Sequence, residues 1–141
     1  MTMTNRLQGS LCTTIDKRLA IITFGHPNAN AFPLELLERL TQEIDKLSEN
    51  NDVSIILLRS EGNKAFCAGA SFDELLAINN EEEGKRFFEG FAHLFLAMGR
   101  CKKLIIGRVQ GKAVGGGVGL IAALDYVFAT EALNIKLSEL S

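Results

Sequence analysis

The chain has 141 residues, of which 47% are hydrophobic, and its 15 basic and 17 acidic residues give a net charge of -2. This length and composition predict one domain with a buried core, and the charge pattern, without a dense block of Lys or Arg, gives no indication of a nucleic-acid partner. The most apolar region, residues 104–129, is interrupted by charged residues, so we expect no membrane segment and no membrane partner.

Two features of the sequence favour a cytoplasmic location. The three cysteines, Cys12, Cys67 and Cys101, are an odd number at wide spacings. The N-terminal residues lack the charged-then-apolar order of a secretory signal. We therefore expect reduced thiols in the cytoplasm, and neither histidine has a partner at metal-ligand spacing, so no metal site is predicted.

The first half of the chain predicts a hairpin, a helix and a strand. Two β-favouring runs, 11–15 and 19–24, are separated by three polar residues, the arrangement of a hairpin. After the break GHPNAN, apolar residues from Pro33 to about Leu47 recur at helical spacing. The apolar run 53–58 predicts a strand buried on both faces, and the helix-strand order suggests a parallel sheet.

The second half alternates helices and strands. The loop SEGNKAFCAGAS, residues 60–71, leads into predicted helices at 72–78 and 82–98. We assign the apolar stripe of the second helix to the core (Phe87, Phe88, Phe91, Leu94, Phe95 and Met98). Strands are predicted at 104–109 and 126–129, with a helix from the glycine cluster to about Leu124 between them. The order ββαβααβαβ is that of an α/β domain, and no internal repeat is visible.

The stretch GKAVGGGVGL, residues 111–120, places four glycines in five positions beside an apolar run. It does not match a P-loop, because Lys112 precedes the glycines. GVGLIA, residues 117–122, matches a dinucleotide-binding fingerprint, but seven residues separate Gly117 from the preceding predicted strand. Close helix packing is another explanation, and the third is that consecutive glycines expose amide N–H groups to an anion or a developing oxyanion.

A second loop of small residues, KAFCAGAS at 64–71, also lies between a predicted strand and a predicted helix. Two such loops on one parallel sheet can each offer one amide to a single oxygen atom. Ordinary tight turns are the alternative for both loops.

Three segments together resemble the crotonase superfamily, the enoyl-CoA hydratases and isomerases. KAFCAGASFDEL and VQGKAVGGGVGLIAALDYVFAT resemble the two signature segments of that family, and HPNANAF resembles its early Asn-Ala segment. The resemblance implies an α/β fold of the ClpP/crotonase type, a spiral of ββα units that binds acyl-CoA thioesters. No cofactor is implied beyond coenzyme A as part of the substrate.

The resemblance also implies site residues. The amides that hold the thioester oxygen as it becomes an enolate would belong to Ala70 and Gly116. The segments that match the family's CoA-binding regions supply further main-chain contacts (Ala29, Ala31, Ala68, Ala70, Ser71, Phe72, Gly115 and Gly116). Family hydratases carry two catalytic glutamates, and here the second falls on Glu139 whereas the first falls on Gly119, which argues against simple hydration.

Family members continue for roughly as many residues again, with a helical C-terminal region that closes the acyl pocket and builds trimers or hexamers. We therefore expect residues 1–141 to form the N-terminal part of a crotonase-like acyl-CoA-binding domain, an incomplete spiral without that helical region. Such a spiral exposes apolar surface and is expected to form homo-oligomers. A truncated, non-catalytic CoA-binding or assembly module is the alternative function.

Overall fold

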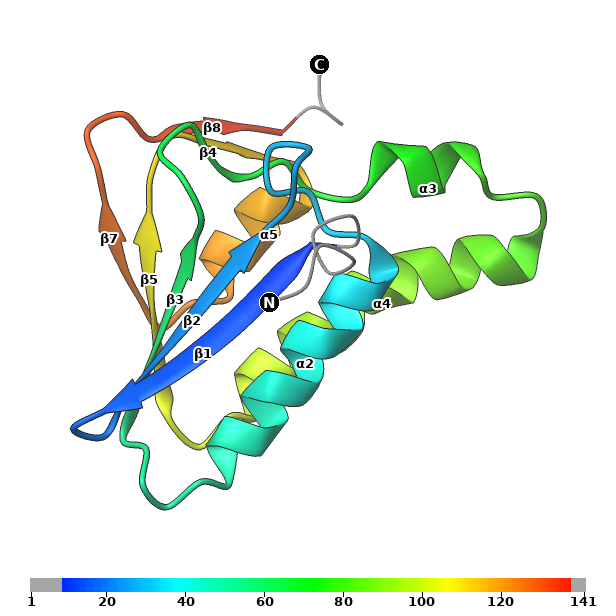
Figure 1. Cartoon of the computed structure of the whole chain (residues 1–141). Coiled ribbons are helices and arrows are strands. Elements are labelled where there is room, and N and C mark those ends of the chain that lie inside the picture. Colours follow the sequence, from blue (N-terminus) through cyan, green and yellow to red (C-terminus); the bar gives the residue numbers. More distant parts are fainter. Residues whose placement is uncertain (1–8, 138–141) are drawn as a thin grey trace.

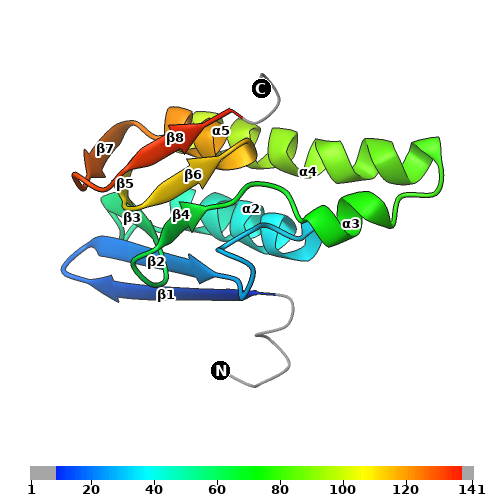
Figure 2. The same cartoon turned by 90° about the horizontal axis from the view of Figure 1, so that it is seen from above.

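In the computed structural model, which describes residues 9–137, the strands form two sheets (Figures 1 and 2). The five-stranded sheet has the order β1-β2-β3-β5-β7 and is parallel except for the β1-β2 hairpin (β1 Ser10–Asp16, β2 Leu19–Gly25, β3 Ile55–Ser60, β5 Leu104–Val109, β7 Tyr126–Ala129). The three-stranded sheet is parallel, with the order β4-β6-β8 (β4 Ala65–Cys67, β6 Lys112–Val114, β8 Asn134–Lys136).

Along the chain, a strand of the larger sheet is followed by a strand of the smaller sheet and then by one or two helices, which makes a ββα repeat. β3 lies in the larger sheet and β4 in the smaller, and two helices follow them (α3 Phe72–Leu76, α4 Glu81–Arg100). β5 and β6 repeat the pattern with α5 (Gly116–Ala122), and β7 and β8 begin it again. The first repeat runs from β2 to α2 (Leu34–Ser48), with Phe32 bridged to Ala70 in place of a full strand. These repeats confirm the predicted spiral of ββα units.

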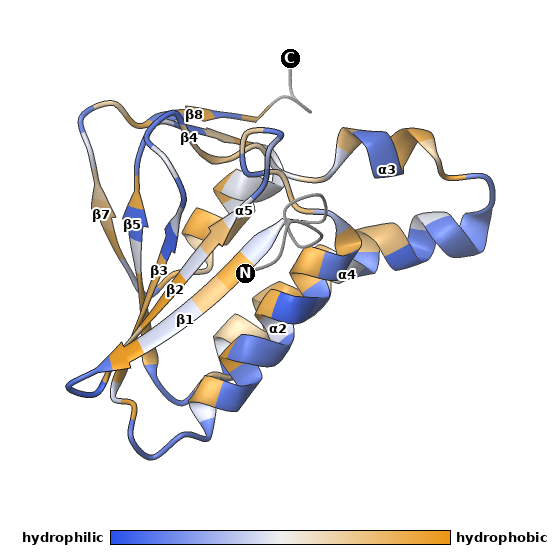
Figure 3. Cartoon of the chain, viewed as in Figure 1, coloured by the Kyte–Doolittle hydropathy of each residue, from blue (hydrophilic) through white to orange (hydrophobic). Residues whose placement is uncertain are grey.

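The core lies between the larger sheet and the helices. Figure 3 shows α2 with an apolar face toward the sheet and a hydrophilic face outward. The buried residues of α2 recur every three or four positions, as the sequence predicts (Leu36, Leu37, Leu40, Ile44 and Leu47). They pack against alternate residues of the strands, including Ile22, Ile56 and Ile105.

Two predictions about strands are wrong. The strands of the smaller sheet were missed, because each has only three residues and is too short to show an alternating pattern. β3 is not buried on both faces, contrary to the prediction for residues 53–58, and neither is β5. Ile56 and Leu58 are buried, but Ile55 and Leu57 are only half-buried and Leu104 is 58% exposed, because the helices cover one side of this sheet (Figure 1).

Apolar surface is exposed at the last two strands, as expected for an incomplete spiral. Tyr126 and Phe128 of β7 and Ile135 of β8 are about half exposed or more, and β7 is an edge strand. None of the helices formed by the described residues is long and apolar enough to cross a membrane. Self-association through the exposed surface stays a prediction.

Two glycines of α4 lie in different surroundings and predict opposite effects of the same substitution. A Cβ on Gly90 would lie 2.8 Å from Cδ1 of Leu34 and 3.0 Å from Cδ1 of Leu37, so Gly90→Ala is expected to destabilise the fold by about 1–2 kcal/mol. A Cβ on Gly99 meets nothing within 4 Å, so Gly99→Ala is expected to stabilise it by about 0.5–1 kcal/mol. Urea denaturation measures both, and equal shifts would contradict close packing of α2 on α4.

Candidate functional site

The candidate site forms where the smaller sheet brings two distant loops together. β4 and β6 pair in parallel, with Ala65 opposite Lys112 and Cys67 opposite Ala113. Parallel strands end at the same edge of a sheet, so residues 68–71 and 115–117 leave that edge side by side. The two glycine-containing loops singled out from the sequence are therefore neighbours.

The two loops touch backbone to backbone. Gly69 has φ +91°, and a Cβ on it would lie 2.8 Å from the carbonyl oxygen of Val114 and 3.2 Å from the amide nitrogen of Gly116. A Cβ on Gly117 would collide with the carbonyl oxygen of Cys67. Gly117, the first glycine of the possible dinucleotide fingerprint, therefore serves close packing of α5 on β4.

The amides of Ala70 and Gly116 stay outside the hydrogen bonding of these loops. Around Ala70, the amide of Phe32 donates to the carbonyl oxygen of Gly69 at 2.8 Å, and the amide of Ser71 donates to that of Phe32 at 3.2 Å. The residue before Gly116 is also paired, since the amide of Gly115 donates to Lys136 at 3.1 Å. Within residues 9–137, neither the Ala70 nor the Gly116 amide donates to a protein oxygen.

A pair of donors left over by the described part of the chain can bind one oxygen atom. Gly69 places the loop of Ala70 within van der Waals distance of Gly116, so both amides belong to one small region. Two N–H groups fixed by the surrounding backbone stabilise negative charge on a carbonyl oxygen without having to reorganise. The structure brings the two loops together, and the role of their amides as an oxyanion site stays a prediction.

Asn30 is a supporting residue that the sequence analysis missed. It is buried with φ +58°, and its Nδ2 donates to the carbonyl oxygens of Glu61 at 2.9 Å and Ala65 at 2.8 Å. Its Oδ1 accepts from the amide of His26 at 3.0 Å. Asn30 thereby ties the segment after β2 to the start of β4. The Asn-Ala segment held a signal for it, because Asn tolerates a left-handed backbone better than most residues.

The remaining residues expected in the site have different surroundings. Ala29 is exposed, and its carbonyl oxygen accepts from the amide of Ala68 at 3.2 Å. An open hollow of about 570 Å³ lies beside Ala29 and is lined by the loops before and after it (His26, Pro27, Ala29, Asn30, Glu61, Gly62, Asn63, Lys64 and Ala65). The Ala31 side chain is buried, whereas the Phe72 side chain is 66% exposed. Glu139 lies outside the described residues.

Two rings of α4 cover the glycines of α5. A Cβ on Gly116 would lie 2.7 Å from Cζ of Phe91, and a Cβ on Gly119 would lie 2.9 Å from Cζ of Phe95. The two rings are 5.8 Å apart and half-buried, so they border the site as well as the core. Phe95 thus occupies the direction in which a side chain at position 119 would project. The assignment of Phe88 to the core is wrong, because this ring is 66% exposed and packs on Phe87.

Cys67 and Asp125 have structural surroundings. Burial raises the pKa of the Cys67 thiol from 9.0 to about 12, which outweighs the opposite effect of the Gly69 amide that donates to its sulfur. A neutral buried thiol is a poor nucleophile. Asp125 accepts from the amide of Ile105 at 2.8 Å, as expected of a structural hydrogen-bond partner.

Comparison with known proteins identifies the family. The family model described as enoyl-CoA hydratase/isomerase matches residues 14–141. The chain belongs to this family, the crotonase superfamily. A crystal structure of enoyl-CoA hydratase from Mycobacterium smegmatis superposes with a TM-score of 0.86 at 30% identity, over 92% of this chain and 51% of that one.

Two curated relatives show the range of names in the family. YngF of Bacillus subtilis (strain 168), named provisionally as an enoyl-CoA hydratase/isomerase, is 33% identical over 132 residues, which are 92% of this chain and 50% of that protein. The mitochondrial 3-hydroxyisobutyryl-CoA hydrolase of Homo sapiens is 30% identical over 125 residues, 84% of this chain and 32% of that protein. The chain thus spans half or less of the length of these crotonase relatives.

The surroundings of Cys67 predict its reactivity. At pH 8, a pKa of about 12 leaves roughly one thiol in ten thousand ionised, so iodoacetamide is expected to leave Cys67 unmodified in the folded protein. Cys12 is exposed and serves as the internal control that reacts. Mass spectrometry of peptides after brief labelling measures both, and labelling of Cys67 at the rate of Cys12 would contradict its burial.

Proposed function

We propose that the chain binds an acyl-CoA thioester and stabilises its enolate through the amides of Ala70 and Gly116. The observation that carries the proposal is the pair of loops held together at Gly69, with these two amides left outside the hydrogen bonding of residues 9–137. Membership of the crotonase superfamily supports it, because the loops are the segments that match the family's signature motifs.

The substrate class follows from what the relatives share. The relatives include a hydratase/isomerase, a dienoyl-CoA isomerase of Arabidopsis thaliana and a 3-hydroxyisobutyryl-CoA hydrolase. These names differ in reaction but agree on a CoA thioester. In such reactions negative charge develops on the thioester oxygen, and two fixed N–H donors bind that oxygen more tightly in the transition state than in the substrate.

Proton transfer suits this site better than hydration. In an isomerisation, a base removes a proton from one carbon, the electron pair moves into the enolate, and the proton returns to a different carbon. A single carboxylate can do both steps, and we propose Glu139 for it on its motif spacing alone. Hydration also needs a held water, and at position 119 the ring of Phe95 takes the space that a second carboxylate would need.

Phe95 also supports a second candidate function, a CoA-binding module without turnover. Gly119 supplies no acid-base group, and the ring of Phe95 covers this position. Such a module is expected to bind acyl-CoA in calorimetry and to show no turnover. Calorimetry and activity assays on the same sample therefore separate the two candidates.

Gly69 and Gly62 offer a matched test of the oxyanion site. Both have positive φ, +91° and +76°, so alanine strains the backbone at either position. Only at position 69 would the new Cβ push against Val114 and Gly116, since at position 62 it meets nothing within 4 Å. Gly69→Ala is expected to slow isomerisation of a 3-enoyl-CoA by about 10²–10³-fold, the effect of losing one oxyanion donor.

Gly62→Ala is expected to retain roughly the wild-type rate of isomerisation. Steady-state kinetics with both variants, after circular dichroism has shown that they fold, gives the comparison. A similar loss of rate in both variants would mean that backbone strain, rather than the oxyanion site, explains the effect.

A second test concerns the reaction itself. Wild-type protein is expected to isomerise a 3-enoyl-CoA faster than it hydrates crotonyl-CoA, because it lacks the first glutamate. Glu139→Gln is expected to lower isomerisation by about 10²–10⁴-fold, the usual contribution of an acid-base group. Glu131→Gln is the matched control, since Glu131 is exposed. Undiminished turnover in Glu139→Gln would remove Glu139 from the mechanism.

A further inference from the structure

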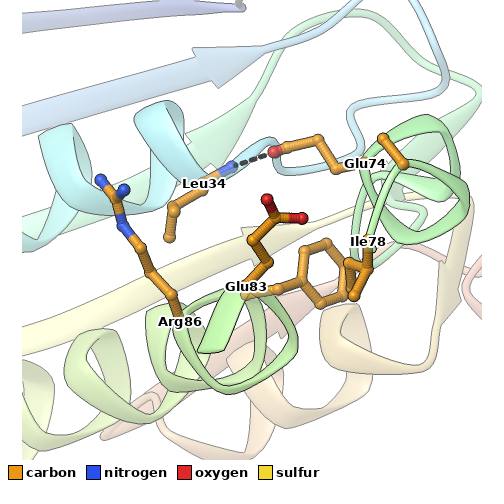
Figure 4. Close-up of a pocket in the computed structure, with 7 residues that line it drawn as sticks. Leu34, Glu74, Ile78, Glu83 and Arg86 are labelled. Carbon is orange, nitrogen blue, oxygen red and sulfur yellow. Dashed lines mark hydrogen bonds between the residues drawn. The ribbon is translucent and has the colours of Figure 1, made fainter. Parts of the chain in front are cut away.

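Helix α2 begins without a cap from its own sequence. The residue at its N-cap position is Pro33, whose side chain accepts no hydrogen bond. Instead, the carboxylate of Glu74 in α3 accepts from the amide of Leu34, with Oε1 at 2.6 Å and Oε2 at 3.2 Å. Figure 4 shows this contact across the gap between the two helices. A side chain 40 residues away in sequence therefore caps α2.

The same contact continues the backbone pairing around Ala70. Phe32 pairs in parallel with Ala70, and the next amide of a parallel ladder on that strand belongs to Leu34. Its backbone partner would be the carbonyl oxygen of Ser71, but that oxygen already accepts from the amide of Leu75 at the start of α3. The Glu74 carboxylate takes its place as the acceptor.

Glu74 is available for this role because its local alternative is occupied. At the N-terminus of a helix, a glutamate three residues after a serine often bonds back to the serine amide. Here the Ser71 hydroxyl caps α3 by accepting from the amide of Glu74 at 3.4 Å, but the amide of Ser71 donates to Phe32. The carboxylate of Glu74 consequently reaches across to α2.

Little else fixes α3 in position. None of its five residues is buried, and Phe72 and Leu76 are more than half exposed. A pocket of about 210 Å³ lies beside α3 and is bordered by Leu34 of α2, Ile78 and Phe87 of α4 (Figure 4). The hydrogen bond to Leu34 is thus a principal link between α3 and the rest of the fold.

We propose that Glu74 is a positioning residue that fixes the Ala70 amide in the oxyanion site. The two backbone hydrogen bonds to Phe32, at Gly69 and Ser71, flank Ala70. The Glu74 contact with Leu34 continues this attachment from the Ala70 loop to the first residue of α2. Losing the second link frees α3 to move and lets the Ala70 amide leave the orientation set by Gly69. This inference rests on the proposed function for its catalytic consequence, but the coupling between Glu74 and the Ala70 loop can be measured by itself.

Three variants test the proposal. Glu74→Ala removes the acceptor, whereas Glu74→Gln keeps an oxygen that can accept from the same amide. Asp73→Ala is the matched control, because Asp73 lies on the same helix, carries the same charge and is exposed. Amide hydrogen exchange resolved by NMR follows Leu34 and the amides of Phe32 and Ser71, whose hydrogen bonds flank Ala70. The hairpin of β1 and β2 reports on global folding.

Glu74→Ala is expected to speed exchange at Leu34, Phe32 and Ser71 by about tenfold or more, with the hairpin unchanged. Asp73→Ala is expected to leave exchange at all these amides at the wild-type rate, and Glu74→Gln to restore most of the protection. Faster exchange at Leu34 alone, or equal exchange in the Glu74→Ala and Asp73→Ala variants, would overturn the proposal, because Glu74 would then be only a helix cap.

Binding of acetoacetyl-CoA provides the second readout, because its enolate absorbs in the near ultraviolet. Glu74→Ala is expected to weaken acetoacetyl-CoA binding and enolate formation by about tenfold, and to weaken the binding of CoA itself by less. Equal affinities for acetoacetyl-CoA in Glu74→Ala and wild type would overturn the catalytic part of the proposal. Failure of the wild-type protein to bind acetoacetyl-CoA would count against the proposed function, and the exchange data would still decide whether Glu74 holds the Ala70 loop.

Discussion

The site depends on the backbone contact between residues 67–69 and 114–117. At this contact no side chain separates the two loops, since a Cβ on Gly69 or Gly117 would press on the main chain of Val114 or Cys67. β4 and β6, which hold the loops in register, have only three residues each. So few ladder hydrogen bonds contribute little to holding two backbones in close contact. Other parts of the structure must therefore hold the loops together.

A row of aromatic rings supplies much of that support. Phe66 of β4 packs on Phe24 of β2 at 5.5 Å, Phe24 packs on Phe32 at 4.8 Å, and Phe32 packs on Phe91 of α4 at 6.1 Å. Phe32 is the residue paired with Ala70, and Phe91 lies against Gly116. The rings thus connect both loops to the core, and each pair adds about 0.5–1.5 kcal/mol beyond burial.

The sequence predicted most of the fold because its main signals are local. The helical spacing of Leu36, Leu40 and Ile44 and the apolar runs of the larger sheet are visible in short windows. The three-residue strands β4, β6 and β8 were missed, because they are defined by partners about 20 or more residues away. Without these strands in the prediction, the ββα repeat could not be recognised from the residue pattern, because the repeat is one of structure and not of sequence.

The site was predictable only in part, for a similar reason. The glycine loops around Gly69 and Gly116 were recognised, because consecutive small residues are unusual and match the family's motifs. Asn30 and Glu74 were not, because each acts through hydrogen bonds to backbone groups 31 to 40 residues distant in sequence. A polar side chain that hydrogen-bonds to the backbone of a distant segment produces no periodic pattern in the sequence.

The pairing of Gly119 with Phe95 links packing to the choice of reaction. The rings of Phe91 and Phe95 lie against Gly116 and Gly119 and lower the local dielectric at the start of α5. A lower dielectric strengthens the interaction of an amide donor with a charged oxygen and disfavours an ordered water. A carboxylate in the same place would do the reverse, by holding water and placing a negative charge near the enolate. In the proposed function, an apolar ring in this position therefore favours a reaction that forms an enolate and returns its proton over one that adds water.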